Sequence, residues 1–94
     1  MRLNEIVKVL MQHHYPEKQA LLTAQELTEL SDSLHPLLSS WIEKDEEADY
    51  SVQGFTLMGL KNMFEMTYPA ALLTIDWLIK DPVEAVKAIT SGIK

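Results

Sequence analysis

The chain has no cysteine and only three glycines among its 94 residues. The absence of cysteine excludes disulfide bonds, thiolate-bound zinc and a cysteine nucleophile. The glycines lie far apart, at Gly54, Gly59 and Gly92, so there is no glycine-rich loop of the kind that holds phosphate groups. No nucleophile motif or pair of catalytic carboxylates is visible either. We therefore expect a protein that is not an enzyme and that has no cofactor, metal or small-molecule ligand.

Long hydrophobic runs are also absent. The most apolar segment, residues 70–79, is interrupted by Thr74 and Asp76 and falls far short of the ~20 residues that cross a bilayer. The first residues lack the continuous apolar stretch and the small-residue cleavage site of a signal peptide. We therefore expect a cytoplasmic protein that does not engage membranes.

Positive charge is scarce. Eight basic residues stand against fourteen acidic ones, for a net charge of −6, and no two basic residues are adjacent. Such a balance opposes binding to nucleic-acid backbones unless cations gather on one face. A basic face would have to be assembled from distant lysines such as Lys61, Lys80 and Lys87. We therefore expect a protein partner, or a second copy of the chain, rather than nucleic acid.

What the chain does contain is helical periodicity. Apolar residues recur at intervals of three and four, which is typical of one helix face, and no segment alternates as a strand would. The hydrophobic content of 47% is enough for a globular domain, and 94 residues are too few for two independent cores. The sequence predicts an all-α protein with a single domain over residues 1–94, folded as a bundle of four or five helices.

The first helix is predicted over residues 3–14, because the residue before Pro16 avoids the helical conformation. The Thr-x-x-Glu pattern from Thr23 to Glu26 predicts the start of the next helix with a capping box.

Pro36 falls inside the apolar stripe that follows. An interior proline removes a backbone hydrogen bond and clashes with the preceding turn. Two alternatives stay open, namely a kinked helix over residues 24–44 or two helices that meet near Ser33.

The acidic stretch over residues 43–49 predicts a surface loop that extends to Gly54. Asp45, Glu47 and Asp49 have the spacing with which a calcium-binding EF-hand loop begins. Tyr50 stands where that loop requires glycine, so we interpret the stretch as a solvated loop. The three histidines, His13, His14 and His35, lack a third ligand and predict no metal site.

Three further helices are predicted in the second half. Thr56 is a candidate N-cap for a helix over residues 57–64. Thr67 is the next candidate N-cap, with Pro69 in the first turn of its helix. The pair Asp81-Pro82 begins the last helix, which Gly92 ends. Its predicted inward residues are Val83, Val86 and Ile89.

Residues 56–79 resemble a helix-turn-helix unit, with a short helix, a tight turn and a second helix. Glu65 occupies the turn position that usually holds glycine. The positions of the second helix that would face a DNA groove are apolar or acidic, whereas base edges are read by Arg, Lys, Asn or Gln. These positions are Tyr68, Leu72, Leu73 and Asp76. The unit is therefore interpreted as serving packing or protein contact.

The two tryptophans each have two interpretations, as core anchors or as interface anchors. The helix that carries Trp77 is apolar on nearly every side, and a small bundle can hide only part of such a helix. Three methionines lie nearby in sequence, at Met58, Met63 and Met66. The predicted interaction residues are Tyr68, Leu72, Leu73 and Trp77.

The leading hypothesis is an acidic helical protein-interaction module, which binds another protein or itself as a homodimer. The alternative is a divergent helix-turn-helix DNA-binding transcriptional regulator.

Overall fold

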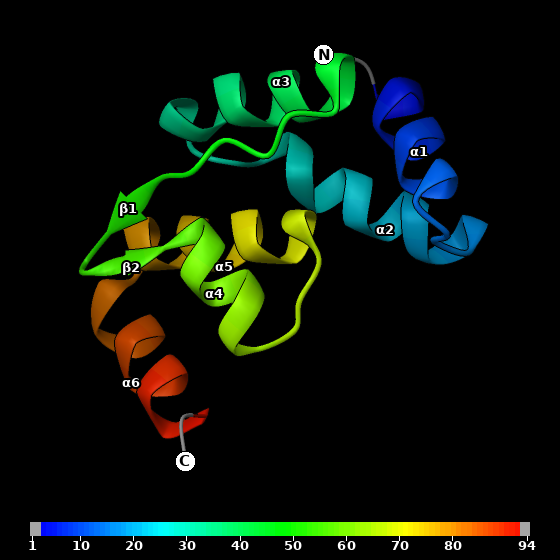
Figure 1. Cartoon of the computed structure of the whole chain (residues 1–94). Helices are drawn as coiled ribbons and strands as arrows, with labels where there is room; N and C mark the ends of the chain where they lie inside the picture. The colour runs from blue at the N-terminus through cyan, green and yellow to red at the C-terminus, as the bar shows by residue number, and fades with distance from the viewer. Residues whose placement is uncertain (1–2, 93–94) are drawn as a thin grey trace. The chain divides into compact units, whose positions relative to one another are not determined.

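The computed structural model describes residues 3–92 and is 73% helical, which confirms the all-α prediction. Six α-helices are present in the described part, so the predicted count of four or five is too low. The helices are joined by one 3-10 turn, η1, and by a two-stranded hairpin (Figure 1). In chain order the elements are α1 (Leu3–Gln12), α2 (Glu17–Thr28), η1 (Asp32–Leu34), α3 (His35–Lys44), β1 (Ser51–Val52), β2 (Phe55–Thr56), α4 (Leu57–Met63), α5 (Tyr68–Lys80) and α6 (Pro82–Gly92).

The chain divides into two compact units, Met1–Ala48 and Asp49–Lys94. We call them unit 1 and unit 2 and describe each by itself. The single domain over residues 1–94 stays a prediction. None of the helices in the described residues has the length and apolarity needed to cross a membrane.

In unit 1, α1 and α2 pack against each other, and α3 also contacts α1. The buried side of α1 consists of Ile6 and Leu10, one turn apart. The side of α2 that is buried carries two alanines, whose small side chains allow helices to approach closely. Those buried residues of α2 are Ala20, Ala24 and Leu27.

The end of α1 lies two residues earlier than predicted. His14 adopts the left-handed conformation (φ 71°), and its backbone N–H donates to the carbonyl of Met11 at 3.1 Å. The N–H of Tyr15 donates to the carbonyl of Leu10 at 3.1 Å. This pair of bonds closes the helix in a Schellman motif, which satisfies carbonyls that the helix leaves open.

The predicted start of the next helix at Thr23 is wrong, because Thr23 lies inside α2. The helix instead follows Pro16, whose carbonyl accepts the first helical bond from Ala20 at 2.8 Å. Proline therefore separates α1 from α2 and also opens α2. The sixth helix in the count comes from the next junction.

The second junction decides between the two alternatives for residues 24–44. α2 ends at Thr28, η1 follows, and α3 begins at His35 with Pro36 in its first turn. Proline is tolerated there because the first turn donates no intrahelical bond. Two helices that meet near Ser33, rather than one kinked helix, are therefore present.

In unit 2, residues 51–56 form a hairpin that the sequence did not predict. Val52 pairs with Phe55, and the two turn residues, Gln53 and Gly54, have φ values of 54° and 82°. Positive φ at both turn residues is typical of the type I′ turn, which matches the twist of a hairpin. Two-residue strands are too short to produce an alternating pattern, so the expectation of no strand is corrected here.

The hairpin leads directly into α4, and the first N–H groups of that helix are satisfied. The N–H of Leu57 donates to the carbonyl of Tyr50 at 3.0 Å. The Thr56 hydroxyl accepts from the N–H of Gly59 at 2.9 Å, which confirms Thr56 as the N-cap. The N–H of Met58 donates to the carboxylate of Asp49 at 3.1 Å.

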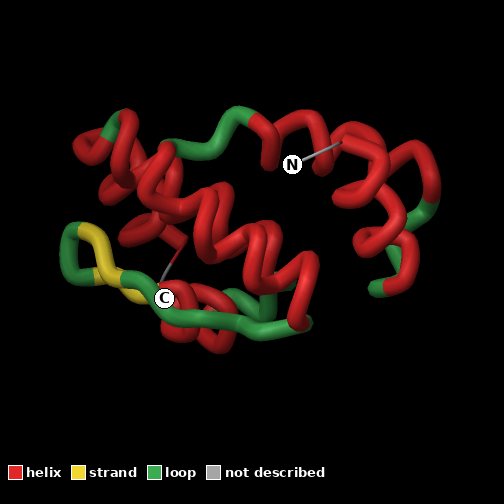
Figure 2. The backbone as a smooth tube through the Cα atoms, turned by 90° about the horizontal axis from the view of Figure 1, so that it is seen from above, coloured by secondary structure: helices red, strands yellow, loops and turns green. Residues whose placement is uncertain are grey.

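Helix α5 packs against α4 and α6 in unit 2. Figure 2 shows the backbone from above, with the hairpin in yellow. Its cap is Thr67, whose hydroxyl accepts from the N–H of Ala70 at 3.4 Å, with Pro69 in the first turn as predicted. More than half of α5 is buried, as expected for a helix that is apolar on most sides. The buried residues are Tyr68, Pro69, Ala71, Leu72, Ile75, Asp76 and Leu78.

The inward face of α6 differs in part from the prediction. Ala85 and Ile89 are buried, whereas Val83 is 67% exposed and Val86 is intermediate. The stripe therefore begins two residues later than predicted. The predicted stop at Gly92 concerns residues 93–94, which lie outside the described part.

Candidate functional site

The four predicted interaction residues lie in two different environments. Tyr68 and Leu72 are buried, with 2% and 0% of their surface exposed. Leu73 is half-buried, and Trp77 is 42% exposed. Trp41, the other tryptophan, is 2% exposed and belongs to the core of unit 1. Of the large aromatic groups proposed for an interface, Trp77 is therefore the one that solvent and a partner can reach.

Trp77 lies at a surface hollow of about 210 Å³ that is formed by α4, α5 and α6. We call it the Trp77 hollow. Its one hydroxyl, on Thr74, donates to the carbonyl of Ala70 at 2.8 Å and so is already satisfied within α5. The hollow therefore offers an apolar surface. Its lining residues are Leu60, Phe64, Met66, Thr74, Trp77, Ala88 and Ile89.

The methionines near this hollow differ in exposure. Met66 lines the hollow, with its sulfur 3.9 Å from the Thr74 hydroxyl. Met63 is 57% exposed at the end of α4, next in sequence to Phe64. Methionine side chains adapt their shape to a partner, although they fill core gaps equally well.

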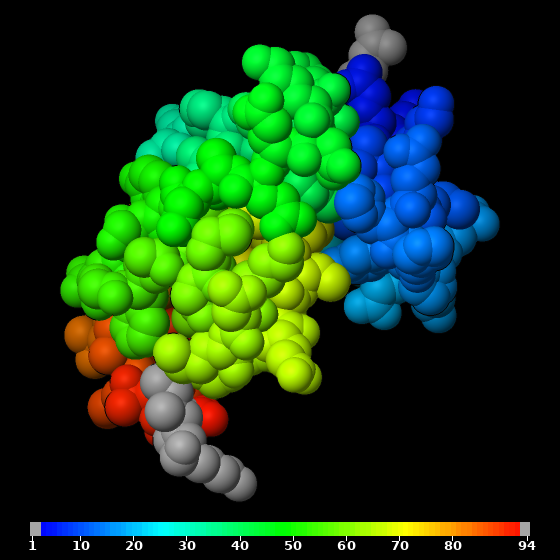
Figure 3. Space-filling view, in the orientation of Figure 1, coloured from blue at the N-terminus to red at the C-terminus, as the bar shows by residue number. Residues whose placement is uncertain are grey.

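In the space-filling view, the hairpin and α4 (green to yellow-green) form much of the visible surface of unit 2 (Figure 3).

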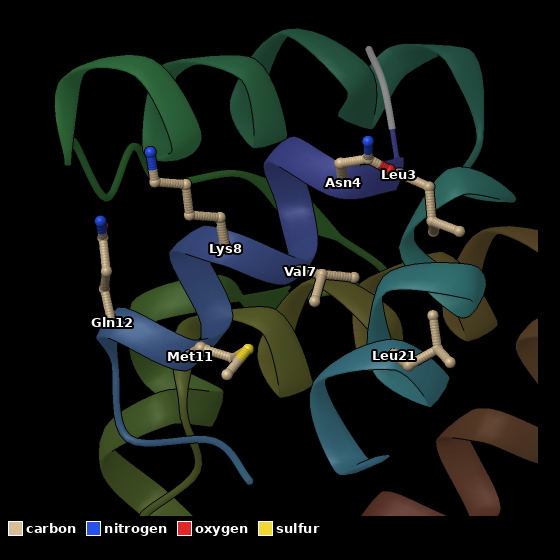
Figure 4. A pocket seen from close by; sticks show the side chains of 7 residues that line it. All are labelled: Leu3, Asn4, Val7, Lys8, Met11, Gln12 and Leu21. Atoms are coloured by element: carbon tan, nitrogen blue, oxygen red, sulfur yellow. The ribbon is translucent and has the colours of Figure 1, made fainter. Parts of the chain in front are cut away.

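A second apolar surface lies in unit 1 and was not predicted. We call it the α1–α2 hollow, and it has a volume of about 660 Å³. Leu21 of α2 faces Val7 and Met11 of α1 across it (Figure 4). Met11 is 45% exposed and Leu21 is 43% exposed. The remaining lining residues are Leu3, Asn4, Lys8 and Gln12.

Lys8 and Gln12 also line a third hollow, on another side of α1, with a volume of about 310 Å³. Glu5 and Glu43 also line this hollow. Nearby, Asp45 Oδ1 lies 3.6 Å from His13 Nε2, at the end of α1. The acidic stretch after α3 therefore begins beside α1, and two acidic residues and one lysine line the third hollow.

The net charge is distributed unequally between the two units. Residues 1–48 contain four basic and nine acidic residues, for a net charge of −5. Residues 49–94 contain four basic and five acidic residues, for a net charge of −1. Unit 1 therefore carries most of the charge that could attract a cationic partner.

The region that resembles a helix-turn-helix unit consists of α4, a turn and α5. Glu65 in the turn has a φ of 53°, the left-handed conformation that glycine adopts most easily. At the positions that would face a DNA groove, Tyr68, Leu72 and Asp76 are buried. Asp76 Oδ2 also lies 2.7 Å from Lys80 Nζ, one turn later in α5.

The acidic residues considered as calcium ligands have other roles or partners. Asp49 Oδ1 accepts hydrogen bonds from the backbone N–H of Tyr50 at 2.8 Å and of Met58 at 3.1 Å. This carboxylate therefore serves the start of α4. Within residues 3–92, no three His, Asp or Glu side chains lie close enough together to hold a metal ion.

Comparison with protein-family models, curated proteins and solved structures finds no match to this chain.

Proposed function

We propose that this protein is an acidic helical interaction module that acts by binding another protein through the Trp77 hollow. The observation that carries the proposal is the exposure of Trp77 on a helix whose other large residues are mostly buried. A half-exposed indole beside an apolar hollow leaves a large apolar area in contact with water, and a bound partner removes that area from water.

The chemistry of the hollow supports this proposal. Tryptophan is enriched among the residues that dominate binding energy, especially where neighbouring side chains form a pocket around the contact. Trp77 is held by α5, which is packed on both α4 and α6, so the indole is carried by a rigid scaffold. A partner therefore binds without having to order a loop first.

The DNA-binding alternative gains no support from the described residues. The buried side chains of Tyr68, Leu72 and Asp76 are not available to base edges, and residues 67–79 contain no Lys or Arg. We therefore propose that the protein binds another protein rather than DNA.

Selection from a displayed library of random peptides tests the proposal with a defined probe. The wild-type chain is immobilised, enriched peptides are synthesised, and their affinities are measured for wild type, Trp77→Ser and the control Val83→Ser. Val83 is exposed on α6 and is not part of the Trp77 hollow. We expect Trp77→Ser to weaken binding by about tenfold or more, and Val83→Ser to leave it unchanged.

Two outcomes would contradict the proposal. Enriched peptides that bind Trp77→Ser and wild type equally would place the contact elsewhere. A dimer in sedimentation equilibrium that Trp77→Ser dissociates would identify the occupant of the hollow as a second copy of the chain.

A further inference from the structure

The α1–α2 hollow has the features of a docking groove that is separate from the Trp77 hollow. Among the residues of unit 1 that the structure describes, three large apolar side chains are substantially exposed, and all three are on α1 or α2. These side chains are Met11, Leu21 and Leu22. Two of them, Met11 and Leu21, face the same hollow from different helices (Figure 4).

The dimensions of this surface fit a helical ligand. Helix α1 has ten residues, which corresponds to a length of ~15 Å at 1.5 Å per residue. Its residues Leu3, Val7 and Met11 follow one another at intervals of one turn along the hollow. A ligand helix that lies along this row presents its own anchors at positions i, i+4 and i+7, as in helix-in-groove recognition.

The polar side of the hollow indicates the charge of the ligand. Lys8 and Gln12 extend from α1 on the side away from Leu21, and they also line the third hollow with Glu5 and Glu43 (Figure 4). Glu5 and Glu43 therefore line a hollow that shares Lys8 and Gln12 with the α1–α2 hollow. Cationic side chains of a ligand can reach these carboxylates while its apolar face occupies the groove.

The net charge of unit 1 argues against a second copy as the occupant. Two copies docked through this surface would bring together two units that each carry a net charge of −5. Like charges at an interface cost free energy and slow association. A cationic partner gains from the same field.

We propose that the α1–α2 hollow binds a cationic amphipathic helix of another protein, with leucine-like side chains in the hollow and Lys or Arg side chains toward Glu5 and Glu43. This inference does not depend on the Trp77 hollow, because it uses residues of unit 1 alone.

The test uses a fluorescein-labelled 18-residue peptide of leucine and lysine, arranged as an amphipathic helix. Two control peptides are measured beside it. One has the same composition in scrambled order, and the other replaces every lysine with glutamate. Fluorescence anisotropy with the full chain gives the affinity of each peptide. We expect the amphipathic cationic peptide to bind and both control peptides to bind at least about tenfold more weakly.

Paired variants locate the binding site. Met11→Ser/Leu21→Ser should weaken binding by about tenfold or more, because it removes the exposed apolar contacts of the hollow. Glu5→Gln/Glu43→Gln should weaken binding about threefold to tenfold at low salt, with a smaller effect at high salt. Val83→Ser and Glu84→Gln are the matched controls on α6 and should change nothing.

The results that overturn the proposal are distinct from those that concern Trp77. Equal binding of the scrambled peptide, or equal binding by Met11→Ser/Leu21→Ser and wild type, shows that the hollow does not recognise an amphipathic helix. A dimer that Leu21→Ser dissociates shows that the occupant is a second copy. Loss of peptide binding in Trp77→Ser would place the peptide in the other hollow, whereas we expect Trp77→Ser to bind it as wild type does.

Discussion

The carboxylate of Asp49 accepts a hydrogen bond from the backbone N–H of Met58, nine residues later, at 3.1 Å. Met58 is the second residue of α4, so this bond satisfies an N–H that the helix itself cannot. A negative charge at this position also interacts favourably with the helix dipole. Asp49 therefore connects the acidic stretch to the start of a helix.

Replacement of Asp49 by alanine should lower the free energy of unfolding by about 1 kcal/mol, which is typical for the loss of a helix N-terminal acceptor. Chemical denaturation followed by circular dichroism measures the change. Glu46→Ala, another acidic residue of the same stretch, is the control and should have little effect. Equal destabilisation by the two substitutions would show that general charge, rather than the bond to Met58, is responsible.

Gly59 should respond to alanine in a way that depends on Thr56. Alanine normally stabilises a helix by up to about 1 kcal/mol relative to glycine. Here the added Cβ would lie 2.8 Å from the Thr56 hydroxyl, which caps the helix through the Gly59 N–H. We expect Gly59→Ala to give no gain in wild type and to stabilise the Thr56→Ala variant. If Gly59→Ala changed the free energy of unfolding equally in wild type and in Thr56→Ala, the proposed clash with the Thr56 hydroxyl would be wrong.

Glu65 should be better replaced by glycine than by a branched residue. The left-handed conformation costs an L-residue roughly 1–2 kcal/mol, and Glu65 pays this cost at φ 53°. We expect Glu65→Gly to raise stability by about 0.5–1 kcal/mol and Glu65→Val to lower it. Thermal and chemical unfolding of the two variants provides the measurement. A more stable valine variant would rule out this conformation in solution.

Leu72 and Trp77 should differ strongly in their effect on stability, although both were predicted as interaction residues. Leu72→Ala creates a cavity at a site with no exposure and should cost about 2–5 kcal/mol. Trp77→Ser alters a residue that is 42% exposed and should cost less than Leu72→Ala. The free energies of unfolding of the two variants test this expectation. A larger loss of stability in Trp77→Ser than in Leu72→Ala would place Trp77 in the core.

The parts of the fold that could be predicted depend on short-range chemistry. The Thr56 and Thr67 caps are local, because each hydroxyl bonds to an N–H three residues later. The Thr23 capping box failed for a related reason. The residue types of a capping box also occur inside helices. The start of α2 at Glu17 was decided by Pro16, the residue directly before it.

The candidate site could be predicted only in part, because exposure depends on packing between elements. Helix α5 is apolar on most sides, so its sequence cannot indicate that Leu72 faces the core and Trp77 faces solvent. The α1–α2 hollow was missed because Met11 and Leu21 belong to different helices. The apolar stripe of α1 indicated a buried face, but not that Met11 would be 45% exposed beside it.

The emission of Trp77 in a Trp41→Phe variant tests the central proposal most directly, with a peptide selected against the wild-type chain as ligand. The chain has two tryptophans, so replacing the buried Trp41 leaves the half-exposed indole of Trp77 as the reporter. We predict that the free variant emits at the long wavelength of a hydrated indole and that the bound variant emits at a shorter wavelength. A peptide that binds by anisotropy without changing this emission would contradict the proposal that Trp77 contacts the partner.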